Sequence, residues 1–290
     1  MINTTKKLLF NIFKRMVYIF QGSGLGNIPF VMAIYKFTLR FLGPSEVNIE
    51  GKNMFIDTGD SMSLSVNGSI SSFQKKILQD EINPGDNVVT VGAHIGYFEL
   101  EMSTLVGNSG KVFAFEPHPD NYKLLVKNMK LNNCKNVVTE QLAVSNSSGK
   151  THLSSNKNSL LNRILLKNDL YCDSDLLSVK SIRLDDYFKN YKGKLNLLMI
   201  DVEGAESFVI DGAKRIIHKN RNIKIVLEFC PKQMIVYGID PTVMLDKISS
   251  MGFKLYDINE DKKKLECKEI SEFINQYSRG DITNILCKRS

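Results

Sequence analysis

The chain of 290 residues contains no tryptophan, only seven prolines and only five cysteines, none of them in a C-x-x-C pair. An odd number of scattered cysteines argues against a disulfide framework, and the missing pairs argue against a thiolate zinc site. We interpret the cysteines as small buried side chains in a reducing compartment, and so expect a cytoplasmic location. They are Cys134, Cys172, Cys230, Cys267 and Cys287.

The first 45 residues lack any acidic side chain and any long apolar run. No run there reaches the ~20 residues that span a bilayer, and Lys14 and Arg15 interrupt what would be the core of a signal peptide. We therefore expect neither a signal peptide nor a transmembrane helix. The segment holds six basic residues, which leaves 32 of the 38 basic residues against all 31 acidic ones in residues 46–290. The net charge of +7 thus belongs to the N-terminal segment, and the nearly neutral remainder does not indicate nucleic-acid binding.

Residues 1–45 are predicted to form a basic amphipathic helical extension, because apolar residues recur at helical spacing in "KKLLFNIFKRMVYIF". Two uses remain open. The segment could lie on an anionic membrane surface, here the inner surface of the cell membrane, or it could cap the rest of the protein or a partner subunit. The sequence does not indicate the oligomeric state.

Residues 46–290 are predicted to form one α/β domain, because short extended segments alternate with helical ones. Helices are expected at 71–82, 97–106, 120–131, 206–217 and 241–252, and the main strands at 88–91, 111–116 and 136–144, in "NLLMIDVEG" at 196–204 and in "IKIVLEFCP" at 223–231. Such alternation predicts a doubly wound, mostly parallel sheet with helices on both faces. Two further extended segments near 252–270 and 281–290, with at most a short helix at 269–277, permit an antiparallel end to the sheet. Residues 155–181 show no clear period and are interpreted as a loop that covers the substrate.

The stretch "VVTVGAHIGYFEL" at 88–100 predicts a ligand site at the end of a buried strand. Gly92 and Gly96 allow a sharp turn and close approach of a ligand to the backbone, and the helix that follows presents free N–H groups. Glu116 follows 20 residues after Gly96 at the end of the next strand, where a carboxylate can accept hydrogen bonds from both hydroxyls of a ribose.

Three carboxylates, Asp201, Glu203 and Glu206, follow the strand at 196–200 in "IDVEGAE". Their mutual repulsion favours catalysis or cation binding, although the two glutamates also suit the N-terminus of the next helix. His94, in the glycine turn, could act as a general base or bind substrate, or it could be a neutral side chain without a chemical role.

An ordered series of segments resembles the FkbM-type S-adenosylmethionine-dependent methyltransferases over about residues 60–255. The series comprises "VGAHIGYFEL", "GKVFAFEPHPDNYKLLVKNMKLNN", "LAVSNSSGK", "IRLDDYF", "IDVEGAESFVIDGA" and "IVLEFCP". The resemblance implies a Rossmann-like class I methyltransferase sheet with an antiparallel C-terminal strand. It also implies S-adenosylmethionine as cofactor and methyl transfer to a hydroxyl, often on a sugar.

The resemblance also assigns roles by position. Residues of the glycine turn and of the next strand ends would bind the donor, and Asp201 would lie near the transferable methyl group. The predicted cofactor-binding residues are Gly92, Ala93, His94, Gly96, Glu116, Pro117, Gln141, Ala143 and Asp201, and the predicted catalytic residues are Asp201, Glu203 and His94. Asp201 or Glu203 would take the hydroxyl proton. A divalent cation held by these carboxylates is compatible with the pattern, but no metal site is predicted.

Two positions depart from the family pattern, since Thr90 stands where the family usually has Asp and His94 where it has Asn. The Asp normally organises the amino end of the donor, so a degenerate, non-catalytic member that acts as a membrane-associated binding module is an alternative. A nicotinamide-dependent dehydrogenase shares the glycine and acid pattern but not the later segments. The expected partner is a small-molecule or glycan acceptor, and no nucleic acid is expected.

Overall fold

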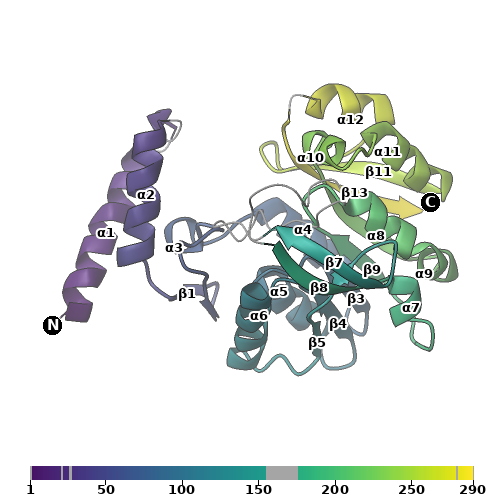
Figure 1. The fold of residues 1–290 in the computed structure, drawn as a ribbon, viewed down its shortest axis with the longest axis horizontal. Coiled ribbons are helices and arrows are strands. Elements are labelled where there is room, and N and C mark those ends of the chain that lie inside the picture. The colour runs from purple at the N-terminus through teal and green to yellow at the C-terminus, as the bar shows by residue number, and fades with distance from the viewer. Residues whose placement is uncertain (1, 21, 26–27, 155–175, 279, 290) are drawn as a thin grey trace. The chain divides into compact units, whose positions relative to one another are not determined.

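The computed structural model describes residues 2–20, 22–25, 28–154, 176–278 and 280–289, and the chain forms two compact units, residues 1–70 and 71–290 (Figure 1). The predicted division into a helical extension, residues 1–45, and an α/β domain, residues 46–290, stays a prediction. The described residues from 71 onward contain every predicted site residue.

The N-terminal unit begins with two helices, as the apolar spacing predicts. Its elements are α1 (Ile2–Phe20), α2 (Pro29–Leu42), the antiparallel hairpin of β1 (Glu46–Ile49) and β2 (Lys52–Phe55), and α3 (Leu64–Asn67). Pro29 occupies the first turn of α2, where its missing N–H costs no hydrogen bond. Among the described helices, none is both long enough and apolar enough to cross a membrane.

The larger unit is built on an eight-stranded sheet in the order β12-β11-β13-β10-β9-β3-β4-β5. Its strands are β3 (Asn87–Val91), β4 (Lys111–Phe115), β5 (Val137–Glu140), β9 (Leu197–Ile200), β10 (Lys224–Phe229), β11 (Phe253–Asn259), β12 (Lys264–Cys267) and β13 (Thr283–Arg289). The five strands from β5 to β10 are parallel, and β13 is antiparallel to both β10 and β11. The predicted α/β sheet with an antiparallel C-terminal strand is therefore confirmed.

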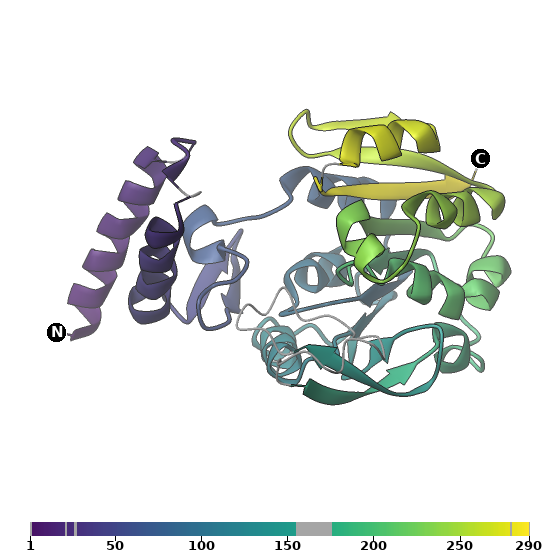
Figure 2. The same ribbon diagram turned by 45° about the horizontal axis from the view of Figure 1, so that its top comes forward.

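Helices cover both faces of this sheet (Figures 1 and 2). They are α4 (Ser72–Glu81), α5 (Tyr97–Val106), α6 (Pro119–Leu131), α7 (Leu184–Tyr187), α8 (Glu206–Gly212), α9 (Lys214–Lys219), α10 (Pro231–Val236), α11 (Pro241–Ser250) and α12 (Ile270–Tyr277). The core has two parts because strand side chains alternate between faces: in β3, Val88 packs with α4 and α5, whereas Val89 and Val91 pack with the cluster under α7, α8 and α9.

The strand order places a topological switch point beside β3. From β3 the chain winds outward through β4 to β5, and it then returns to place β9 on the other side of β3. In open α/β sheets the ligand binds at such a point, outside the carboxyl ends of the strands. The ends of β3, β4, β9 and β10 therefore frame the candidate site.

Several segments differ from the predictions. Residues 149–154 and 176–182 form β7 (Gly149–Ser154) and β8 (Leu176–Ile182), which join β6 (Ala143–Val144) in a second, three-stranded sheet. The expected covering loop is thus wrong for residues 176–181, and its remainder, residues 155–175, lies outside the described residues. The single helix expected at 206–217 is two helices, α8 and α9, because Ala213 between them has non-helical φ and ψ of −116° and 3°.

The cysteine prediction is only partly correct. Cys230 and Cys287 are buried and Cys134 is half-buried, but Cys267 is exposed. Cys267 ends β12, the edge strand of the sheet, which has no buried residue. Cys172 lies outside the described residues.

Candidate active site

The glycine turn after β3 is held tightly against the neighbouring strands. A Cβ atom on Gly92 would lie 1.8 Å from the Asp201 carbonyl oxygen, so only glycine fits there, and its φ is +89°. The N–H groups of Gly92 and Ala93 both donate to the Phe115 carbonyl at 3.0 Å. Gly96, also at positive φ, is the N-cap of α5. The turn is therefore fixed relative to both β4 and β9.

Glu116 follows β4 and ties the turn to the second strand. Its Oε2 accepts from the His94 backbone N–H and its Oε1 from the His118 N–H, both at 2.9 Å. Burial raises the pKa of this carboxyl to about 7. The Asn121 side chain also hydrogen-bonds to this carboxyl group, so about one of its four lone-pair sites remains to accept a hydroxyl hydrogen of a ribose.

The His94 backbone explains why this position suits His or Asn. Its φ is +50°, in the left-handed region that Asn, Asp and His adopt more often than other non-glycine residues. Its recorded contact to the site is the backbone N–H to Glu116. Both the catalytic role of His94 and its interpretation as a neutral side chain stay predictions.

Asp201 and Glu203 lie together directly after β9, as predicted. The Asp201 N–H donates to the Val91 carbonyl at 2.9 Å, which anchors the loop beside the glycine turn. Glu203 Oε2 accepts a hydrogen bond from Gln233 Nε2, which leaves Oε1 to contact a ligand. Burial raises the pKa of Asp201 to about 6, and burial together with the Asp201 charge raises that of Glu203 to about 7.

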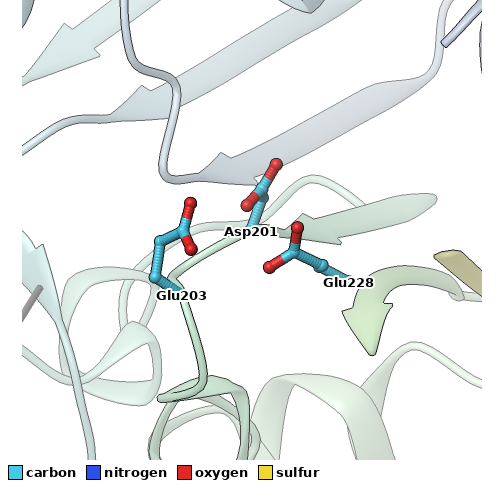
Figure 3. A group of neighbouring side chains, drawn as sticks. All are labelled: Asp201, Glu203 and Glu228. Carbon is cyan, nitrogen blue, oxygen red and sulfur yellow. The ribbon is translucent and has the colours of Figure 1, made fainter. Parts of the chain in front are cut away.

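Glu228, near the end of β10, joins this pair. Figure 3 shows the three side chains converging from the loop after β9 and from the adjacent strand, and one oxygen of each lies within 4.8 Å of the others. Glu228 Oε2 is buried and receives no hydrogen bond. Burial and the neighbouring acidic groups hold the pKa of Glu228 well above its usual range. We refer to Asp201, Glu203 and Glu228 as the carboxylate triad.

Glu206 has a structural position at the start of α8. Its Oε1 accepts from the backbone N–H groups of Val202 and Gly204 at 3.2 and 3.1 Å, which closes the loop around Glu203. The side chain is buried, and burial raises its pKa to about 7. The sequence left two roles open for Glu206, one in catalysis or cation binding and one at the N-terminus of the next helix. The geometry fits the second role.

A further carboxyl group, that of Glu99, lies under the glycine turn. Glu99 is in the first turn of α5 and only 2% exposed, and Thr90 at the end of β3 is equally buried. Burial raises the pKa of Glu99 to about 7; the Thr90 hydroxyl lowers it, whereas the charges of Glu116 and Asp201 raise it further. Glu99 thus places a carboxyl group beside Thr90, whose own side chain has none.

Six acidic groups therefore influence one another at this edge of the sheet: Glu99, Glu116, Asp201, Glu203, Glu206 and Glu228. None of them forms an ion pair with Lys or Arg in the part of the chain that the structure describes. Buried carboxyl groups without a cation either hold protons or await a positive ligand.

The remaining predicted residues lie at the ends of β4 and β5. Pro117 follows Glu116 directly and is half-buried, and Gln141 follows β5 and is exposed. Ala143 is in β6, where its side chain packs with Leu153 and Val179. Their contacts with a cofactor stay predictions.

Sequence reasoning missed Glu99, Glu228 and Gln233. Glu228 stands in the apolar run "IVLEF", and an acid within a buried strand was the available signal. Glu99 stands among apolar residues in "YFELEM", but the spacing alone does not say that it faces inward. Gln233 carries no such signal.

The chain matches the model of the methyltransferase FkbM domain over residues 90–255. It is 32% identical over 154 residues to methyltransferase sdnD of Sordaria araneosa, a match that covers 43% of this chain and 59% of that protein. The chain therefore spans less than two thirds of that relative.

Solved structures with a similar arrangement share little sequence. The O-methyltransferase of Bacillus cereus in complex with SAH is 11% identical, with a TM-score of 0.44 over 76% of this chain and 82% of that one. Aeropyrum pernix fibrillarin with bound S-adenosylmethionine is 12% identical, with a TM-score of 0.45 over 83% and 84%. Because the FkbM match covers more than half of the residues, this chain belongs to the FkbM methyltransferase family.

Proposed function

We propose that this protein transfers a methyl group from S-adenosylmethionine to a hydroxyl oxygen of a sugar or related polyol. The observation that supports this most is the set of six interacting acidic groups, none of which pairs with a Lys or Arg among the described residues, beside a glycine turn at the switch point. S-adenosylmethionine carries a positive sulfonium and a positive ammonium group, which suit such a site. The polyol class of acceptor follows from the family resemblance.

The chain's own residues provide binding and proton transfer. When bound, S-adenosylmethionine supplies the electrophilic methyl group. The fixed glycine turn and Glu116 position the donor, and orientation of the two reactants lowers much of the barrier. Asp201 or Glu203 Oε1 accepts the proton of the attacking hydroxyl. With pKa values of about 6 and about 7, both groups are close to the range in which a general base works best at neutral pH.

Binding and turnover test this proposal. Calorimetry should detect S-adenosylmethionine but not NADH, and Glu116→Ala should abolish the heat. In a methyl-transfer screen over sugars and lipids, Asp201→Asn or Glu203→Gln should lower turnover by about 100-fold or more, the usual contribution of a general base. Asp246→Asn, on the exposed side of α11, is the matched control. Near-normal turnover in both site variants contradicts the assignment of the base, and absence of donor binding favours a non-catalytic protein.

The carboxylate triad favours a second version of the mechanism, in which a divalent cation lowers the pKa of the acceptor hydroxyl. The three carboxylates each offer one oxygen within 4.8 Å of the others, and Glu228 Oε2 receives no hydrogen bond. Together they form a reasonable ligand set for Mg²⁺ or Mn²⁺. Titration with Mn²⁺ should then show binding that Glu228→Gln weakens about tenfold or more. Full turnover in the presence of a strong chelator contradicts this version and leaves the proposal of methyl transfer unaffected.

A further inference from the structure

The two N-terminal helices pack on each other through a small aromatic contact. The rings of Phe13 in α1 and Tyr35 in α2 are 5.6 Å apart, and Phe10 and Leu39 are buried. The helices lie side by side in both views (Figures 1 and 2). This contact uses only one side of each helix.

The other sides carry an unusual number of exposed apolar side chains. Twelve of the nineteen exposed large apolar residues recorded for the described chain lie between Leu8 and Phe41. They are Leu8, Leu9, Ile12, Met16, Tyr18, Ile19, Phe20, Ile28, Phe30, Ile34, Phe37 and Phe41. In α2, residues 30, 34, 37 and 41 recur at the spacing of one helical face, and residues 8, 12, 16 and 19 do so in α1. We call these two rows the apolar stripes.

The charges around the apolar stripes are all of one sign. Residues 1–45 contain six basic and no acidic side chains, and Lys14 donates a hydrogen bond to the Ser65 carbonyl at 3.2 Å. Lys7, Arg15, Lys36 and Arg40 are exposed. Apolar stripes flanked by basic residues match the boundary between acyl chains and anionic headgroups.

We propose that α1 and α2 dock this protein on the surface of an anionic lipid membrane, with the apolar stripes in the headgroup region. A second copy of the chain fits this surface less well, because the six positive charges of one copy would repel the six positive charges of the other. The nearly neutral remainder of the chain offers no matching excess of acid. An anionic bilayer satisfies both the apolar and the charged side chains.

Co-sedimentation of the full chain with vesicles tests the proposal. The vesicles contain phosphatidylcholine alone or phosphatidylcholine with phosphatidylglycerol. We expect binding to the anionic vesicles that decreases with added salt. The stripe variant Phe30→Ser with Phe37→Ser, and the charge variant Lys36→Glu with Arg40→Glu, should each weaken binding about tenfold or more. Val243→Ser and Lys135→Glu, exposed positions in the larger unit, are matched controls that should bind normally.

Three results would overturn the proposal. One is a full-length protein that stays in the supernatant with anionic vesicles. The second is a stripe variant that binds as well as the unchanged chain. The third is a dimer in sedimentation velocity that the stripe variant abolishes, without lipid binding, which would assign the surface to a second copy. Circular dichroism of each variant verifies that the helices remain folded.

Discussion

At the scale of single residues, Glu99 bears most directly on whether the site can hold a donor. The family pattern has an acidic residue where this chain has Thr90, yet the buried carboxyl group of Glu99 lies close enough for the Thr90 hydroxyl to influence its pKa. A carboxyl group is therefore present near Thr90, on α5 rather than on β3. Thr90 alone is then a poor reason to regard the site as decayed.

Glu99→Gln is expected to weaken S-adenosylmethionine binding by about tenfold or more, because a hydrogen bond to a charged group contributes about 1.5–3 kcal/mol. Adding Thr90→Asp to Glu99→Gln should restore part of the affinity, because it returns one carboxylate to the same place. Calorimetric titration measures both, with the exposed Asp120→Asn as control. Unchanged affinity in Glu99→Gln would show that this carboxyl group does not contact the donor.

Donor binding should also depend on pH. Burial raises the pKa of Glu116 and of Glu99 to about 7, and the ionised form of each is the one that accepts hydrogen bonds from the donor. Affinity should therefore rise from pH 6 to pH 8 and level off above that range. Glu116→Gln should bind weakly and show a smaller slope, because one titrating carboxyl group fewer then contacts the donor. A calorimetric affinity for the unchanged protein that stays constant over this range contradicts the prediction.

At the scale of elements, one buried carboxylate joins three segments at the antiparallel end of the sheet. Asp257 of β11 accepts hydrogen bonds from the Tyr277 hydroxyl of α12 at 2.9 and 2.8 Å and from the Thr283 hydroxyl of β13 at 2.7 Å. It also pairs with Lys268, whose side chain is nearly buried. The network fixes α12 against the hairpin of β11 and β12.

Asp257→Ala should lower the free energy of unfolding by about 3–5 kcal/mol, because it leaves a buried cation and two hydroxyl groups without their partner. Asp257→Asn should cost less, since the amide oxygen still accepts. Urea denaturation monitored by circular dichroism measures both, and the exposed Asp246→Asn is expected to stay within about 0.5 kcal/mol of the unchanged protein. A similarly small effect of Asp257→Ala would mean that the network adds little stability.

The elements that the sequence predicts well are those with one clear period. The helix expected at 97–106 is α5 with the same bounds, and the strand at 88–91 is β3 with one added residue. The small sheet of β6, β7 and β8 was missed, although β6 lies within the strand expected at 136–144, because local spacing does not reveal pairing between segments that are distant in sequence. Glu228 was missed for a related reason: its proximity to Asp201 depends on β10 lying beside β9, which spacing does not reveal.

At the scale of the whole molecule, the acidic site should reduce the stability of the ligand-free protein at neutral pH. Glu99, Glu116 and Glu206 have pKa values raised from 4.5 to about 7, so the folded state binds their protons more tightly than the unfolded state. Their contribution to stability is full below pH ~4.5 and is lost as pH rises to about 7. Glu81 and Asp211 have lowered pKa values and act in the opposite sense, below that window.

S-adenosylmethionine should therefore raise the melting temperature more at pH 8 than at pH 6. The donor binds the ionised site more tightly, and a ligand stabilises the folded state by an amount that grows with the logarithm of its concentration divided by its dissociation constant. Differential scanning fluorimetry at fixed donor concentration measures this difference. A shift that is equal at the two pH values, or larger at pH 6, contradicts the charge argument.

The position of β13 between β10 and β11 has a consequence for biosynthesis. β11 and β12 precede β13 in the chain, yet β11 reaches the sheet only through β13. On the ribosome, a nascent chain that has already emerged as far as β12 still has β10 as an open, apolar sheet edge. Order of translation and order of assembly therefore differ, and this interval is the one in which a chaperone would have an exposed strand to protect.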